Sequence, residues 1–242
     1  MPEEMNKLIS AISNKEIIER GSRIYYKGTL SGQEVVAVFS RWGKVAAATT
    51  ATHLILEFKV DRIVFTGVAG AISPDLNIGD IVIGQHLFQH DMDARPLMRR
   101  FEIPLTGKTS YEIPRQNIDT MAHAVHNFLK NNKEFRKLLA EQNILHPKLV
   151  IGDIASGDLF ISSKAMKDAL LRHLPSVACA EMEGAAVAQV CDDYEIPLTV
   201  IRVISDNANE EAHISAIGFV NQHAGEYSLS ILDYYIQIIN AN

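Results

Sequence analysis

Short aliphatic runs that alternate with segments of helical periodicity are the most constraining feature of this sequence. Residues 62–67, 149–154 and 198–204 are rich in Val, Ile and Leu. Such runs are typical of strands buried on both faces, whereas a strand with one face in water alternates apolar and polar residues. Residues 44–56 and 184–193 instead place apolar or small side chains at helical spacing. The alternation predicts an α/β protein with a sheet covered by helices.

The remaining segments extend this pattern along the chain. A β-hairpin is predicted from two β-rich runs joined by Ser31-Gly32-Gln33. The other expected elements are a helix over 3–18, the hairpin strands 23–30 and 34–40, a strand over 80–84, helices over 117–131 and 165–172, and a closing helix over 217–239. Because no repeat, low-complexity tract or linker interrupts the chain, we expect a single domain over residues 1–242.

The composition of the chain indicates which kinds of partner it is suited to bind. The 242 residues include 23 Lys and Arg and 29 Asp and Glu, which gives a net charge of −6. A net negative charge does not favour binding to the phosphates of nucleic acid. No apolar run is long enough to cross a membrane. The two cysteines, Cys179 and Cys191, are too few for a disulfide scaffold, and the N-terminus does not resemble a secretory signal. We expect a cytoplasmic protein with no nucleic-acid or membrane partner.

Segments at the carboxyl ends of three predicted strands contain residues that could bind a ligand. In open α/β sheets, ligands bind at these ends of the strands. Residues 66–71 read Thr-Gly-Val-Ala-Gly-Ala, which we interpret as a small-residue loop that a ligand can approach closely. An ordinary glycine turn is the alternative interpretation. The glycine spacing does not match a dinucleotide-binding fingerprint.

The other two strand ends carry acidic side chains. In Ala180-Glu181-Met182-Glu183-Gly184-Ala185, Glu183 could interact with the dipole of the following helix or accept hydrogen bonds from a sugar diol. In Val203-Ile204-Ser205-Asp206-Asn207, burial would raise the pKa of Asp206 and suit it to proton donation, although an Asp here could also cap a turn.

Four segments together resemble the 5′-methylthioadenosine/S-adenosylhomocysteine nucleosidases of the nucleoside phosphorylase-like superfamily. They are residues 66–70, 155–161, 180–185 and 202–206, with the Met-Glu pair followed by a small-residue helix and then by Arg-x-x-Ser-Asp. The resemblance implies a three-layer α/β/α sandwich with a mixed central sheet. It also implies hydrolysis of the N-glycosidic bond of an adenine nucleoside, without a cofactor, by a homodimer.

The resemblance assigns the proton transfers to two carboxyl groups. Asp206 would protonate nitrogen 7 of adenine, and Ser205 would orient it. Glu4, in the family's Met-x-Glu-Glu context, would act as the base that activates water, although a Glu in a first helical turn also suits the helix dipole. An acid for the leaving group and a base for water are what glycoside hydrolysis requires.

The remaining assigned residues bind the substrate. Glu183 would hold the ribose diol and Met182 would pack beneath the sugar, where cationic character develops. Phe160 would stack on adenine, the backbone of Ile161 would read the edge of the base, and Gly70 would contact the substrate from the small-residue segment.

The chain departs from the family at several points. The family has a β-strand before the Met-x-Glu-Glu segment, and these 242 residues do not supply it, so we expect the sheet to lack that strand. Trp42 stands where the family often has a small or aliphatic residue beside the 5′ substituent. Arg95 is out of character in a stretch that lends apolar residues to a partner's pocket, and Ala216 replaces an aromatic for which Phe219 could substitute. The 5′ group, whether methylthio, homocysteinyl, deoxy or that of aminofutalosine, stays open.

Two alternative functions are compatible with these residues. One is a purine nucleoside phosphorylase, in which Arg202 could contact the anion; the small-residue segment itself contains no Arg. The other is a protein that binds adenine nucleosides without turnover. A metal site drawn from His86, His90, Asp91 and Asp93 has no standard spacing, and we expect no metal.

Overall fold

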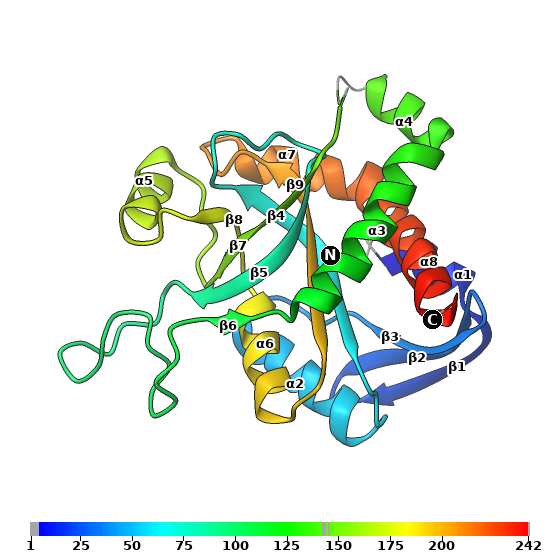
Figure 1. Ribbon diagram of the computed structural model, residues 1–242, viewed down its shortest axis with the longest axis horizontal. Helices are drawn as coiled ribbons and strands as arrows, with labels where there is room; N and C mark the ends of the chain where they lie inside the picture. The colour runs from blue at the N-terminus through cyan, green and yellow to red at the C-terminus, as the bar shows by residue number, and fades with distance from the viewer. Residues whose placement is uncertain (1–4, 142–143, 145, 242) are drawn as a thin grey trace.

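Two β-sheets, one of three strands and one of six, form the framework of the protein in a computed structural model that describes residues 5–141, 144 and 146–241 (Figure 1). The strands are β1 Ser13–Arg20, β2 Arg23–Leu30, β3 Gln33–Val38, β4 Ile63–Ala71, β5 Ile81–Gln89, β6 Tyr111–Glu112, β7 Leu149–Ser156, β8 Val177–Glu181 and β9 Leu198–Asp206. The helices are α1 Asn6–Ala11, α2 Lys44–Leu56, α3 Arg115–Asn131, α4 Lys133–Ala140, α5 Lys164–His173, α6 Gly184–Asp193, α7 Ala212–Phe219 and α8 Gly225–Ala241.

The larger sheet is mixed and closes on itself. Its order is β6-β5-β7-β8-β4-β9, and β5 pairs with β9 as well as with β7. Strands β4 and β9, β5 and β7, and β7 and β8 run parallel, whereas β5–β9 and β4–β8 are antiparallel. The expected α/β fold with a mixed sheet is confirmed. The sheet itself is a partly barrel-like ring, which differs from the open central layer of the expected three-layer sandwich.

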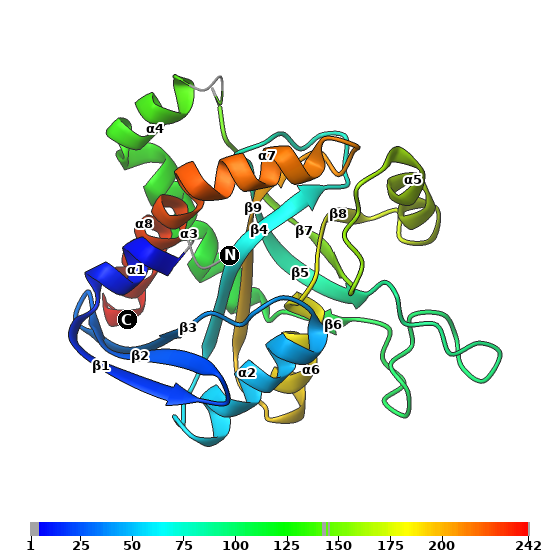
Figure 2. The same ribbon diagram turned by 180° about the vertical axis from the view of Figure 1, so that it is seen from behind.

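Helices cover this ring on different sides. Helix α2 packs beside α6, and α3 packs beside α8, as the two opposite views show (Figures 1 and 2). Helix α3 buries Met121, Val125 and Phe128 in the main core. Phe128 also contacts Tyr227 of α8, with ring centroids 5.5 Å apart. Helices α2, α3, α6 and α8 therefore pack into the main core, whereas α5 contributes Leu170 to a second, smaller cluster.

The expected helix over 3–18 is wrong in its second half. Helix α1 ends at Ala11, and Ser13–Arg20 forms β1, which pairs antiparallel with β2 and places Ile17 opposite Tyr26. Almost every side chain of β1 is exposed. The strand therefore has little burial pattern that a sequence could reveal, and its pairing with β2 outweighs the helical spacing of its few apolar residues.

The other expectations are met to different degrees. The helices over 44–56 and 184–193 and the first hairpin strand are confirmed with the same bounds, and β3 ends at Val38. The closing helix instead starts at Ala212, and a π-helical turn, Val220–Ala224, separates α7 from α8. The short elements α4 and β6 were not expected. Among the described residues, no helix has the length and apolar character needed to cross a bilayer.

The small-residue segment 66–71 is not a loop but the second half of β4. Gly70 there lies opposite Asp206 of β9 on one side and opposite Ala180 of β8 on the other. A Cβ on Gly70 would lie 2.8 Å from Oδ1 of Asp206, so only glycine lets the strands approach this closely. The ends of β4, β8 and β9 therefore meet at one point, which positions the site.

Candidate active site

A cavity of about 940 Å³ opens where these three strands end. It brings together every sequence-predicted site residue that the structure describes: Gly70, Phe160, Ile161, Met182, Glu183, Ser205 and Asp206. Glu4, the expected base, lies outside the described residues. Residues from the ends of separate strands therefore line one cavity, as the sequence predicted.

Asp206 is a buried carboxyl group at the end of β9. Its side chain is held from two sides: Oδ1 accepts a hydrogen bond from the Ala208 backbone amide at 2.8 Å, and Oδ2 accepts one from the Ser205 hydroxyl at 2.9 Å. Burial raises the pKa of Asp206, although these two hydrogen bonds and the charge of Lys167 oppose the shift. A carboxyl group fixed in this way and inclined to retain its proton is suited to general acid catalysis.

The two glutamates at the end of β8 have different tasks. Glu181 accepts hydrogen bonds from the Gly184 amide at 2.8 and 2.9 Å, so this side chain caps α6. It also forms an ion pair with Arg202, with 2.7 Å between Oε2 and Nη2, and accepts a hydrogen bond from the Ser156 hydroxyl. The helix-capping interpretation considered for Glu183 therefore belongs to Glu181.

Glu183 consequently faces the cavity rather than the helix. Its side chain makes no capping hydrogen bond to α6, and its Oε1 accepts one from the Gly43 backbone amide at 2.8 Å. Burial and the neighbouring charge of Glu181 raise the pKa of Glu183 to about 7. A carboxylate that is this costly to ionise gains from hydroxyl donors, which a vicinal diol supplies in pairs.

Comparison with known proteins places this site in a family. A sequence profile of the Phosphorylase superfamily matches residues 1–237. The 5′-methylthioadenosine/S-adenosylhomocysteine nucleosidase of Chromohalobacter salexigens is 32% identical over 232 residues, which cover 96% of this chain and 92% of that protein. The chain belongs to this nucleosidase family.

Two further members of the superfamily are as similar. The aminodeoxyfutalosine nucleosidase of Helicobacter pylori is 35% identical over 226 residues, covering 93% of this chain and 90% of that protein. The crystal structure of a Streptococcus pneumoniae MTA/SAH nucleosidase in complex with 8-aminoadenine matches with a TM-score of 0.83 at 31% identity, covering 98% of this chain and 96% of the other. The nucleosidase fold thus extends over almost the whole chain.

Arg202 is a buried part of the nucleosidase site that does not offer its charge to a ligand. Its Nε and Nη2 donate to Glu181, and its Nη1 donates to the carbonyl oxygens of Phe65 and Ile201. The guanidinium also lies over the ring of Phe65, 4.4 Å from the centroid. Because its charge is neutralised and its donors are occupied, Arg202 is poorly placed to bind a phosphate anion.

The residues expected around the base and the 5′ group form the mouth of the cavity. Ile161 is buried, whereas 44% of Phe160 and 65% of Trp42 are exposed. Trp42 precedes Gly43, whose φ of 89° is in the region that favours glycine. This backbone turn presents the Gly43 amide to Glu183 and leaves the indole of Trp42 at the cavity wall.

The sequence analysis did not single out two lysines that form contacts beside the cavity. Lys167 of α5 donates to the carbonyl oxygens of Ala71 at 2.7 Å and Asn207 at 3.3 Å, and so ties the ends of β4 and β9 together beside Asp206. Lys44 contacts Asp91 at 2.6 Å, which anchors the turn that carries Gly43. Neither lysine belongs to a motif, so no local signal distinguishes them from surface charges.

Three of the four residues considered as a metal cluster are engaged separately. His86 contacts Asp153 at 2.8 Å, and Asp93 pairs with Arg95 at 2.6 Å. Asp91 is bound to Lys44, as described above. Within the described part of the chain, no three His, Cys, Asp or Glu side chains are grouped as metal ligands would be.

Proposed function

We propose that this protein hydrolyses the N-glycosidic bond of 5′-substituted adenine nucleosides, such as 5′-methylthioadenosine and S-adenosylhomocysteine, and releases adenine. One observation carries this proposal: a buried acid, Asp206, and a second carboxyl group, Glu183, line the same cavity. One group suits the leaving base and the other suits the ribose, and both have a raised pKa.

The proposed reaction begins at the base. Asp206, protonated and held by Ser205, donates its proton to nitrogen 7 of adenine, which converts the base into a better leaving group. As the bond to the ribose breaks, positive charge develops on the sugar. Glu183, accepting the two ribose hydroxyls, stabilises that charge, and Met182 packs against the sugar. Phe160 stacks on adenine while the backbone of Ile161 reads its edge.

Water completes the proposed reaction. Glu4 is the proposed base that removes the proton from the attacking water, on the strength of its Met-x-Glu-Glu context alone. Arg202 lines the cavity, but its charge is already neutralised by the ion pair with Glu181. This favours water over phosphate as the group that attacks the sugar. Gly70 lines the cavity beside Asp206, and its lack of a side chain leaves room next to the proposed acid.

The 5′ substituent has two candidates. Methylthio and homocysteinyl groups are supported by the similarity to the Chromohalobacter salexigens nucleosidase. The larger group of aminodeoxyfutalosine is supported by the comparable similarity to the Helicobacter pylori enzyme. Trp42 favours the second candidate because its exposed ring at the cavity wall offers a broad surface to a bulky group.

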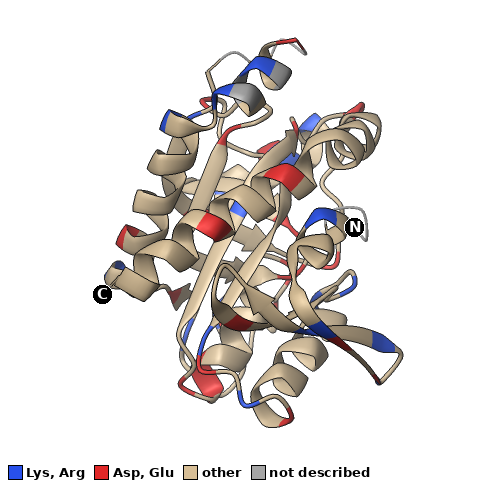
Figure 3. Ribbon diagram, turned by 90° about the vertical axis from the view of Figure 1, so that its right-hand side faces the viewer, with Lys and Arg blue, Asp and Glu red and all other residues tan. Residues whose placement is uncertain are grey.

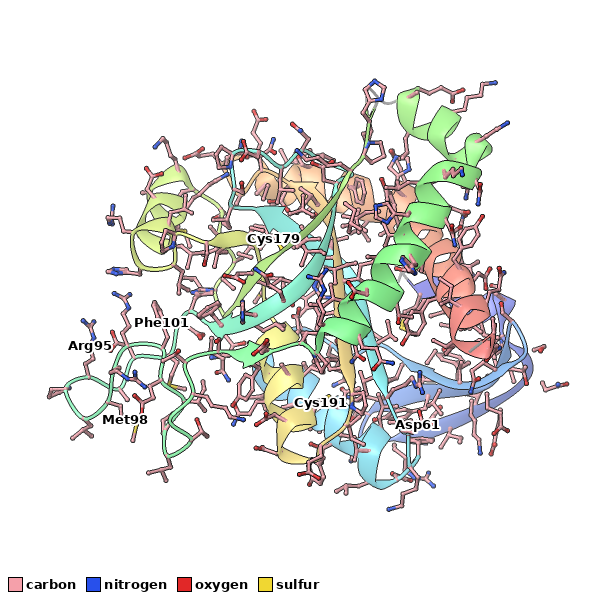
Figure 4. All side chains as sticks on the ribbon, viewed as in Figure 1. Asp61, Arg95, Met98, Phe101, Cys179 and Cys191 are labelled. Atoms are coloured by element: carbon pink, nitrogen blue, oxygen red, sulfur yellow. The ribbon has the colours of Figure 1, made fainter. Side chains whose placement is uncertain are left out.

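We further propose a cytoplasmic homodimer. Arg95, Met98 and Phe101 lie on the long loop between β5 and β6, which extends away from the sheet (Figure 4). Leu97 is 87% exposed and Leu105 is 94% exposed on the same loop, and an exposed apolar loop is suited to cover a partner's surface.

The cysteines bear on the proposed cytoplasmic location. Cys179 and Cys191 are buried free thiols on different elements, as expected in a reducing compartment (Figure 4). In the view of Figure 3 basic and acidic residues are interspersed on the side that faces the viewer.

Adenine release from 5′-methylthioadenosine, measured with and without phosphate, tests the proposed function. Free adenine and a reducing sugar, formed at a rate that phosphate does not change, are the expected result. A sugar 1-phosphate formed only with phosphate would establish a phosphorylase instead. Nucleoside binding without any product from methylthio, homocysteinyl or aminodeoxyfutalosine substrates would establish a binding protein.

A further inference from the structure

The turn before α2 presents two consecutive backbone amides to carboxyl groups from distant parts of the chain. The Gly43 amide donates to Oε1 of Glu183 at 2.8 Å, and the Lys44 amide donates to Oδ1 of Asp158 at 2.7 Å. Gly43 occupies the position before α2 and has no side chain with which to cap the helix. The first amides of a helix lack partners within it, so the start of α2 is capped by these two carboxyl groups instead.

Asp158 is itself fixed by a closed set of hydrogen bonds. Its backbone amide donates to Oδ2 of Asp91 at 2.9 Å, and Oδ1 of Asp91 accepts from Nζ of Lys44 at 2.6 Å. The Lys44 amide closes the set by donating to Asp158. These three residues, which we call the turn network, join the segment after β5, the segment after β7 and the start of α2.

Gly43 packs closely against Asp158. Its φ is 89°, and a Cβ at this position would lie 2.9 Å from Oδ1 of Asp158, so both the backbone angle and the contact require glycine. The same Oδ1 accepts from the next amide along the chain. The position of the Asp158 carboxylate therefore sets where the turn lies and how the Gly43 amide is directed.

The Gly43 amide matters for the charge of Glu183. Burial and the neighbouring charge of Glu181 raise the pKa of Glu183 to about 7, and the hydrogen bond from Gly43 opposes this rise more strongly than the charge of Arg202 does. Arg202 is already paired with Glu181 at 2.7 Å. On the side of the turn, the cation of the turn network is likewise bound by a carboxylate. The Gly43 amide is thus the donor of the turn that stabilises ionised Glu183.

We propose that Asp158 is a positioning residue for Glu183: its carboxylate holds the turn so that the Gly43 amide donates to Glu183 and keeps that side chain ready to accept the ribose hydroxyls. Asp158 is exposed, and the three residues after it, 159–161, line the cavity. The segment assigned to adenine therefore also fixes the group assigned to the sugar. The positioning is a matter of geometry, whereas its effect on ribose rests on the proposed function.

Two substitutions at this position separate the hydrogen bond from the charge. Asp158→Ala removes the acceptor of the Lys44 amide, whereas Asp158→Asn removes the charge and keeps an oxygen that can accept from it. Asp192→Ala is the matched control, since Asp192 pairs with Lys108 at 2.6 Å and lies at the end of α6 remote from Glu183. All three variants should unfold within a few degrees of the parent, because exposed ion pairs contribute little to stability.

NMR measures the positioning without any substrate. In Asp158→Ala the Gly43 amide should exchange with solvent at least about tenfold faster than in the parent, because the turn is released. Titration of the Glu183 carboxyl should then give a pKa above that of the parent, because ionised Glu183 has lost a donor. In Asp158→Asn and Asp192→Ala neither the exchange rate nor the pKa should rise.

Kinetics measure the consequence for the ribose. Asp158→Ala should lower kcat/KM for 5′-methylthioadenosine by about tenfold, which is the effect of one weakened hydrogen bond to a charged group. The loss should be smaller for the 2′-deoxy analogue, so that discrimination between the two nucleosides falls at least about threefold. Asp158→Asn should restore most of this discrimination, because its oxygen still accepts from the Lys44 amide.

Three outcomes would overturn the inference. The first is a Gly43 exchange rate and a Glu183 pKa in Asp158→Ala equal to those of the parent. The second is an Asp158→Asn variant that behaves like Asp158→Ala, since the charge and not the acceptor would then matter. The third is an equal loss of kcat/KM for both nucleosides. Absence of adenine release by the parent would refute the proposed function instead, and the two NMR measurements would still decide whether Asp158 positions Glu183.

Discussion

Glu181 caps the helix that follows it, and this leaves Glu183, two residues later, turned toward the cavity. The first carboxylate is neutralised by Arg202 at 2.7 Å, while the second receives a hydrogen bond from the Gly43 amide at 2.8 Å. Two chemically identical side chains thus become a structural anchor and a candidate ligand group. The difference arises from their partners, which are Arg202 and the Gly184 amide for Glu181 and the Gly43 amide for Glu183.

Replacement of Asp206 by Asn should abolish base release without unfolding the protein. Asn keeps the shape and can still accept from the Ala208 amide, but it has no acidic proton to transfer to adenine. Loss of a general acid typically costs about 10²–10⁴-fold in rate. Adenine release measures the effect, and thermal unfolding confirms the retained fold. Turnover close to that of the parent would show that another group supplies the proton.

Replacement of Glu183 by Gln should weaken ribose binding and catalysis together, because an amide oxygen accepts less strongly from hydroxyls than a carboxylate does. The parent should also discriminate against 2′-deoxyribosides, and the Glu183→Gln variant should discriminate less. Values of kcat/KM for paired ribo- and 2′-deoxy substrates measure this. If the parent treated both alike, Glu183 would have no role in holding the diol.

The stability of the protein should fall as Glu183 ionises. Its pKa in the folded protein is about 7, against an ordinary value of 4.5, so the folded state holds a proton that the unfolded state releases. The stabilising contribution of the protonated form is complete below pH 4.5 and is lost as the pH rises through 7. A shift of this size corresponds to about 3 kcal/mol at most. Glu183→Gln should therefore unfold several degrees higher than the parent at pH 8, and at a similar temperature at pH 4.5. Parallel curves at both pH values would contradict the raised pKa.

Lys167 should lower the pKa of Asp206 without contacting the substrate. Its charge lowers the pKa of Asp206, in opposition to burial, so Lys167→Met should raise that pKa further. The alkaline limb of the kcat/KM profile, where Asp206 loses its proton, should then move to higher pH. Lys167→Arg, which keeps the charge, is the matched control and should leave the limb near its original position. A loss of activity with no shift of the limb would reduce Lys167 to a purely structural tie between the strand ends.

Trp42 should select among 5′ substituents. Trp42→Ile removes the broad ring at the cavity wall and should increase the preference for methylthio over larger groups. The ratio of kcat/KM for 5′-methylthioadenosine and aminodeoxyfutalosine measures the change. An unchanged ratio would place Trp42 outside the region that contacts the 5′ group.

Sequence patterns predicted the interior of the fold better than its margins. The helices over 44–56 and 184–193 are rich in apolar and small residues, the strand over 198–204 is a nearly continuous aliphatic run, and the structure contains each of them. Strand β1 could not be predicted because its side chains are exposed and its partner lies in β2. Closure of the ring through β5 and β9 depends on pairing between Ile81 and Val203, which are distant in sequence.

The positions singled out at the ends of apolar runs lie together in the structure. Gly70, Glu183 and Asp206 line one cavity, because strand ends that share one edge bring their residues together, whereas their roles stay predictions. The division of labour between Glu181 and Glu183 was not predictable, since it depends on the distant Arg202. The same holds for Lys167, whose acceptors are backbone oxygens of two other elements.

The ion pair between Glu181 and Arg202 also limits how this sequence can diverge. Both side chains are 2% exposed, so the loss of either would leave an uncompensated charge in the interior. A single substitution at one position would be selected against until the other changed as well. Across an alignment of related chains, the two positions should therefore either be invariant or vary as a correlated pair, whatever nucleoside each relative has come to prefer.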